Sequence, residues 1–152
     1  MQYHLDIIKQ TRANIIKLTD SYSIEILNEI PKGFNNNLIW NLGHVIVTHQ
    51  LLCYSMSGNK PLVHADLIAA FRKGSKPEGN VGKQQYELLK ELAYSTLDSF
   101  SEDYKNGLFS EYKAYDTSFG VSLTGIEDAL QFNAVHEGMH LGYCQGLRRS
   151  LG

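Results

Sequence analysis

Two histidines, His136 and His140, stand four residues apart in a segment whose apolar residues recur at helical spacing. Positions i and i+4 lie on the same helix face about one turn apart, so both imidazoles can reach a single ion. Two histidines can also share a face by chance. A metal site therefore requires a further ligand elsewhere in the chain.

The same stretch, residues 136–140, matches the HExxH pattern of zinc proteases, in which the glutamate acts as general base. A protease of that type needs a third protein ligand, usually downstream. Residues 141–152 contain no His, Asp or Glu, and position 146 is glycine. We therefore interpret the match as accidental and look upstream for the third ligand.

His44 is the best upstream candidate, because it lies in the middle of the apolar segment 38–47. A single histidine in such a place is usually a core residue with a hydrogen-bonding partner. Burying three neutral imidazoles in one domain is costly, however, and a shared metal ion would satisfy all three. The sequence thus predicts that His44, His136 and His140 bind one divalent transition metal.

Three histidines leave one position of a tetrahedral ion open, which is typical of catalytic rather than structural sites. Ligation by imidazoles alone suits zinc, nickel, iron and cobalt, and the sequence does not choose among them. Zinc is our first expectation.

Several neighbouring residues could assist such a site. His49 lies about 140° around the helix from His44, so we expect it at the surface or behind the ligands, not on the same ion. Trp40, one turn before His44, could fill the core or line the metal pocket, and core filling is favoured. Asn133 faces the histidine pair and could orient a ligand, whereas Glu137 is expected to point away.

The elements that must position these histidines are four amphipathic helices. A crossover rich in Gly, Pro and Lys, residues 57–82, joins the second helix to the third and contains one helical turn at 66–71. The aromatic-rich stretch 108–121 is expected to be irregular or extended and to cover one end of the helices. The helices themselves are expected at about 6–27, 37–56, 84–103 and 124–149.

This order predicts an all-α fold, a four-helix bundle with a long crossover loop between helices two and three, formed by a single domain over 1–152. Facing helices of such bundles commonly build metal sites in the core. We expect Asn36 or Asn37 to cap the second helix, and Thr124 with Glu127 to form a capping box at the fourth.

Composition excludes several classes of function. The chain has 43% hydrophobic and 20% charged residues and a net charge of −2, without the clustered Lys and Arg of nucleic-acid or membrane-surface binding. It has no signal-peptide pattern at residues 1–19 and no run near the ~20 apolar residues that cross a membrane, so we expect a cytoplasmic protein. Cys53 and Cys144 lack CxxC spacing and are expected to be reduced and buried.

The chain contains two short motifs, Trp40-x-x-Gly43-His44 and His136-x-x-x-His140-x-Gly142-x-x-x-Gly146-x-x-Arg149. Together they resemble the DinB-like superfamily. The resemblance implies an antiparallel-type four-helix bundle with a long second connection, a three-histidine metal site and frequent homodimers. It also implies, for some members, thiol-dependent S-transferase or isomerase activity. His44 matches the helix-two ligand, and His136 and His140 match the helix-four pair.

The resemblance and the predicted open metal position together favour a metal-dependent transferase that activates a low-molecular-weight thiol toward an electrophile. Two alternatives remain open: a metal-binding stress-response module without turnover, and a metal-dependent hydrolase. The repeat of Gly138, Gly142 and Gly146 would allow close packing of another helix, including one from a second copy of the chain.

Overall fold

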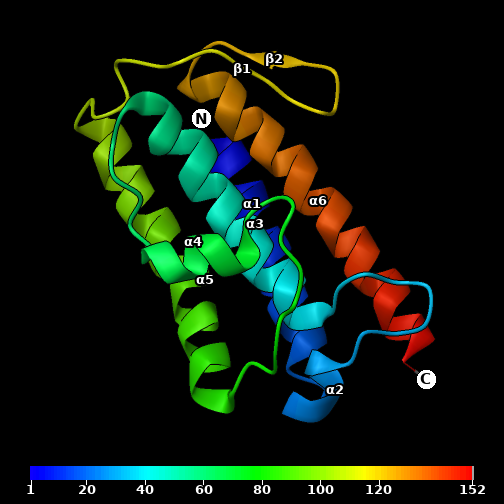
Figure 1. Cartoon of the computed structure of the whole chain (residues 1–152). Helices are drawn as coiled ribbons and strands as arrows, with labels where there is room; N and C mark the ends of the chain where they lie inside the picture. The colour runs from blue at the N-terminus through cyan, green and yellow to red at the C-terminus, as the bar shows by residue number, and fades with distance from the viewer. Residues whose placement is uncertain (152) are drawn as a thin grey trace.

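A computed structural model of the chain describes residues 1–151. Four long helices form a bundle, and three short helical segments and a two-stranded hairpin connect them (Figure 1). This confirms the predicted all-α four-helix fold. The long helices are α1 (Gln2–Thr19), α3 (Leu38–Cys53), α5 (Lys83–Lys105) and α6 (Ile126–Ser150). The short elements are α2 (Ile24–Asn28), the 3-10 helix η1 (Ser55–Ser57), α4 (Ala65–Phe71), β1 (Tyr115–Asp116) and β2 (Ser122–Leu123).

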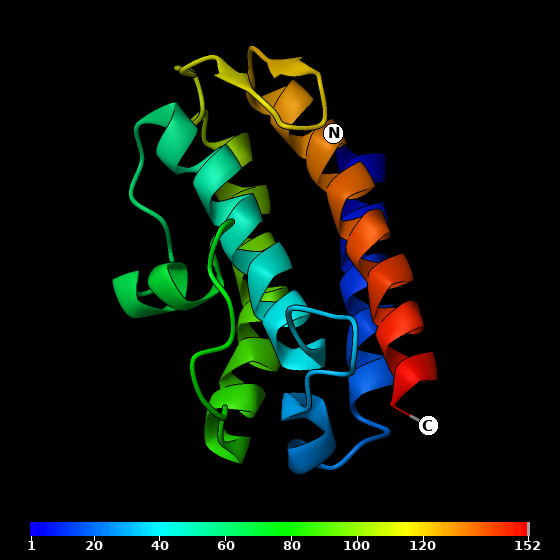
Figure 2. The same cartoon turned by 45° about the vertical axis from the view of Figure 1, so that its right-hand side comes forward.

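The directions of the helices explain the long crossover. Helices α1 and α6 run one way along the bundle, and α3 and α5 run the other way (Figures 1 and 2). Because α3 and α5 are parallel neighbours, the chain must return the full length of the bundle between them. Residues 54–82 make this return, and α4 lies within it against α3.

Helix α3 is enclosed by its neighbours α1, α4, α5 and α6, and nearly all of its side chains are buried. Contact with α4 depends on Gly43. A Cβ atom at this position would lie 2.5 Å from the ring of Phe71, the last residue of α4. The glycine before His44 therefore lets the crossover pack directly onto α3.

The first helix is shorter than expected. Helix α1 ends at Thr19, and α2 is a separate element rather than its continuation to residue 27. The turn is held by α5, where the Tyr86 hydroxyl lies 2.7 Å from Thr19 Oγ1 and 2.9 Å from Asp20 Oδ1. Leu27 is still buried. The apolar spacing therefore continues through α2, and it gives no sign of the turn between α1 and α2.

One of the two predicted helix caps is correct. The Asn37 side chain accepts a hydrogen bond from the Trp40 N–H at 2.8 Å, as expected for a cap of α3. The capping box at α6 is wrong, because the Thr124 N–H and hydroxyl donate to the Asp128 carboxylate instead. Glu127 accepts from the Tyr104 hydroxyl of α5.

The aromatic-rich stretch forms the antiparallel β1–β2 hairpin, in which Tyr115 pairs with Leu123, and it covers one end of the bundle (Figure 1). None of the helices within residues 1–151 has the length and apolar character needed to cross a membrane.

Candidate metal centre

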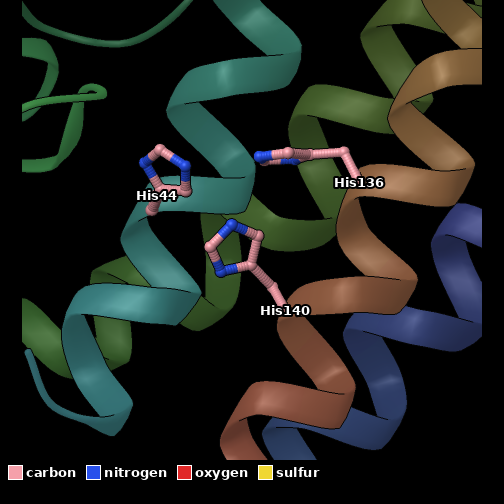
Figure 3. A group of neighbouring side chains, drawn as sticks. All are labelled: His44, His136 and His140. Carbon is pink, nitrogen blue, oxygen red and sulfur yellow. The ribbon is translucent and has the colours of Figure 1, made fainter. Parts of the chain in front are cut away.

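The three predicted ligands meet between α3 and α6. His44 projects from α3 toward His136 and His140 on α6 (Figure 3). The ring centroid of His44 lies 5.2 Å from that of His136 and 4.7 Å from that of His140, and the two α6 rings are 4.5 Å apart. One ring nitrogen from each histidine lies within 4.8 Å of the others, an arrangement that can hold a metal ion.

The crossover fixes the protonation of His44. Its Nδ1 lies 2.7 Å from the backbone oxygen of Phe71. A carbonyl oxygen can only accept, so Nδ1 carries the proton and donates it. Nε2 is therefore unprotonated and can accept, which is the role that such a hydrogen bond plays for metal-binding histidines; the Thr48 hydroxyl lies 3.4 Å from it.

An asparagine does the same for His140. The His140 Nδ1 lies 2.8 Å from Asn41 Oδ1. The amide nitrogen of Asn41 is occupied, since it donates to the Asn37 carbonyl at 2.8 Å and to Asn36 Oδ1 at 2.9 Å. This assigns the oxygen side of the amide to His140, so His140 also keeps its proton on Nδ1 and presents Nε2.

Burial keeps the three rings neutral. It lowers the pKa of His136 to about 3, with further lowering from the neighbouring His140 and His44. Burial and His44 lower the pKa of His140 to about 4. Burial also lowers the pKa of His44, against the opposing effect of the Phe71 hydrogen bond. Near pH 7 all three imidazoles are therefore in the uncharged form that metal ligation requires.

These residues fit a divalent metal in charge state and tautomer. Zinc–nitrogen bonds of about 2.0–2.1 Å separate tetrahedral ligand atoms by about 3.3 Å. In the structure the three ring nitrogens lie within 4.8 Å of one another, so their separation can be somewhat larger than in a tetrahedral zinc site. The Nδ1 atom of His136 is buried and has no hydrogen-bonding partner among residues 1–151.

A pocket of about 220 Å³ opens beside the cluster. His44 and His136 form part of its wall, whereas His140 does not. A fourth ligand position on the His44–His136 side of the cluster would face this pocket. The remaining lining residues are Thr48, Leu51, Leu52, Met56, Lys73, Tyr115, Thr117, Ser118 and Phe132.

Trp40 fills the core, as favoured, and also contacts one of the predicted ligands, although it does not line the pocket beside the cluster. Its ring is stacked on His44, with centroids 4.5 Å apart and an angle of 12° between the planes. It is also buried in the main apolar core, and its Nε1–H donates to Ser75 at 3.1 Å. Trp40 therefore fills the core and supports the imidazole of His44 at the same time.

Two neighbouring residues lie in the core, which rules out the surface position considered for His49. His49 is not at the surface but fully buried, with its ring 5.0 Å from that of Phe100. Asn133 is also fully buried, and its amide nitrogen donates to Ala129 O at 2.9 Å and lies 3.7 Å from Cys53 Sγ, so it forms no hydrogen bond with the three histidines. The expected reduced, buried state of Cys53 and Cys144 is confirmed.

Glu137 points away from the cluster, as expected, and forms an ion pair that the sequence reasoning missed. Arg12 of α1 donates to both carboxylate oxygens, with Nη2 2.7 Å from Oε1 and Nε 3.0 Å from Oε2. Both side chains are completely buried. The available signal was the position of Arg12 on the apolar face of α1, between Ile8 and Ile15.

Fold and site together define a helical bundle with a three-histidine cluster between two helices, and comparison with known proteins gives its family. The DinB superfamily model matches residues 7–144. The chain belongs to this superfamily. A search of curated proteins gave no match.

Among solved structures, the chain is similar to one described as "Crystal structure of the conserved protein of locus from Enterococcus faecalis". The TM-score is 0.70 at 13% sequence identity, over 99% of this chain and 95% of that one. At this identity the similarity supports the fold alone.

The hydrogen bond from His140 to Asn41 gives a direct test of ligand orientation. We expect Asn41→Leu to weaken metal binding about 10- to 100-fold, because His140 loses the acceptor that fixes its tautomer. Competition with a chromophoric chelator measures the change. Asn36→Ala is the control, since it removes a neighbour of Asn41 but leaves Asn41 Oδ1 in place. An equal loss in both variants would contradict the specific role of Asn41.

Proposed function

We propose that the chain binds one divalent transition metal through His44, His136 and His140 and activates a low-molecular-weight thiol for transfer to an electrophile. The observation that carries the proposal is the convergence of three neutral imidazoles, two of them fixed with the proton on Nδ1 and with Nε2 unprotonated. Bound there, a divalent metal with an open position would lower the pKa of a thiol or water held in that position.

The chain's own residues supply the rest of the site. The apolar side chains Leu51, Leu52 and Phe132 limit the water around a reacting sulfur. In the transfer, the thiol proton leaves to solvent, a sulfur–carbon bond forms, and the leaving group departs with the electron pair of its broken bond. No Asp or Glu lines the pocket, so no carboxylate is placed as a general base for water. This disfavours the hydrolase alternative.

The metal site is tested by elemental analysis of tag-free protein after loading with zinc, nickel, iron or cobalt. We expect about one ion per chain in the wild type and nearly complete loss in His44→Ala, His136→Ala and His140→Ala, because each removes a ligand. His64→Ala, at an exposed histidine outside the cluster, should keep the ion. A wild type that takes up none of these metals would refute the proposal.

Trp40 gives an independent readout, since it is the only tryptophan and is stacked on His44. Its fluorescence should change on titration with nickel or cobalt in the wild type and His64→Ala, but not in His140→Ala. Consumption of a thiol in the presence of a model electrophile then separates turnover from binding. Stoichiometric metal with no thiol chemistry would favour the non-catalytic metal-binding module.

The homodimer is likewise a proposal. Helix α6 exposes Val135 (50%) and Met139 (46%) beside glycines 138 and 142, where an added Cβ would meet nothing within 4 Å. A second copy could approach closely there. We expect a dimer mass by sedimentation equilibrium and a shift toward monomer in Val135→Lys. Tyr3→Lys, at an exposed apolar residue on α1, is the control. A monomeric wild type would refute the dimer.

A further inference from the structure

The pocket beside the histidine cluster has a distinct division of chemistry. Leu51 and Leu52 of α3, Met56 after it and Phe132 of α6 give it an apolar wall. The lining also includes four residues that carry hydroxyl groups, Thr48, Tyr115, Thr117 and Ser118. A ligand in this space would therefore bury hydrocarbon against one side and find hydrogen-bonding groups on another.

Lys73 is the one lining side chain that carries a full charge at pH 7. It comes from the crossover, two residues after Phe71, whose backbone oxygen holds His44. The lining contains no carboxylate, and within residues 1–151 Lys73 takes part in no ion pair. Its charge is thus available to a ligand.

The hydroxyl groups are not equally available. The Thr117 hydroxyl donates to the Val121 backbone oxygen at 2.7 Å, which closes the hairpin. The Thr48 hydroxyl lies 3.4 Å from His44 Nε2. Tyr115 and Ser118 form no side-chain hydrogen bond with the described residues, so both can turn toward a polar group of a ligand.

We infer that this pocket binds a small organic carboxylate, with its apolar chain against Leu51, Leu52, Met56 and Phe132 and its charged group held by Lys73. The ligand must be small, because the pocket has a volume of about 220 Å³, whereas most ligand pockets have roughly 300–1,000 Å³. The inference deepens the proposed function and rests on it for the reaction, because the carboxylate would belong to the thiol or to its electrophile. Binding itself needs no metal.

The test uses hexanoate, 6-mercaptohexanoate and neutral hexanamide, titrated by calorimetry into chelator-treated and zinc-loaded protein. We expect the wild type to bind hexanoate about tenfold more tightly than hexanamide in both forms, since a hydrogen bond between two charged groups is stronger than one to a neutral group. Lys73→Met should remove this preference. Lys76→Met, at an exposed lysine of the same crossover outside the pocket, should keep it.

The outcomes separate this inference from the proposed function. Equal binding of hexanoate and hexanamide, or a preference unchanged in Lys73→Met, overturns the inference. If hexanoate binds only to zinc-loaded protein, and equally in Lys73→Met, the metal binds the carboxylate. This result also overturns the inference. A Lys73-dependent preference in protein that takes up no metal supports the inference and refutes the metal site. Tighter binding of 6-mercaptohexanoate than hexanoate, only with zinc, assigns the carboxylate to the thiol; equal binding assigns it to the electrophile.

Discussion

Arg12→Met lowers the free energy of unfolding by about 3–5 kcal/mol, because it leaves the Glu137 carboxylate buried without a partner. Arg12 and Glu137 are both 0% exposed, and the guanidinium also donates to Ala93 O at 3.0 Å. An uncompensated charge in this position has neither water nor another cation to stabilise it. Urea unfolding of chelator-treated protein measures the loss.

Two further variants distinguish an unpaired charge from lost packing. The double variant Arg12→Met/Glu137→Leu should recover most of the loss, since replacing both partners by apolar groups removes the charge that has to be buried. Lys9→Met breaks the exposed Lys9–Asp98 pair, which joins α1 to α5, and should cost about 1 kcal/mol or less. If Arg12→Met costs no more than Lys9→Met, the prediction is wrong.

The ion pair matters for the site because Glu137 directly follows His136. Its attachment to Arg12 ties α6 to α1, whereas His136 and His140 of the same helix contact His44 of α3. This limits rotation of α6 about its axis, which would carry His136 away from His44. A structural contact made by α1 thus helps to position a side chain between α3 and α6.

Sequence periodicity predicted the four long helices because each buries an apolar face that repeats every three to four residues. It could not predict the end of α1, since Leu27 continues that spacing beyond the turn. Helical spacing also left a surface position open for His49, which is fully buried. The segment 38–47 is apolar on every side, which is typical of a helix enclosed by others, and that signal would have placed His49 in the core.

The three histidines could be brought together from the sequence because helix geometry relates His136 to His140 and the bundle supplies His44. The partners that orient them could not. The acceptor for His44 is a backbone oxygen of Phe71, and a carbonyl has no sequence signature. The acceptor for His140 is Asn41, on another helix, so the pair depends on the register between α3 and α6.

Acid is expected to destabilise the metal-free protein strongly. The pKa of His136 is lowered to about 3 and that of His140 to about 4, chiefly by burial, whereas both titrate near 6.5 when the chain is unfolded. The unfolded chain therefore takes up protons first as the pH falls. The stabilising contribution of the neutral rings is complete above pH ~6.5 and is lost toward pH ~3. Between pH 7 and 5 these two residues together should cost about 4 kcal/mol.

Urea unfolding at a series of pH values, with chelator present, tests this linkage. His136→Gln should reduce the slope of unfolding free energy against pH by about 1.4 kcal/mol per unit between pH 6 and 4, because one proton-binding group is removed. His64→Asn, at an exposed residue whose side chain caps α4, should leave the slope unchanged. The fully buried His49 should behave like His136, since burial and then Arg12 lower its pKa well below 6.5. Equal slopes for the wild type, His136→Gln and His49→Gln would mean that these rings accept protons in the folded protein.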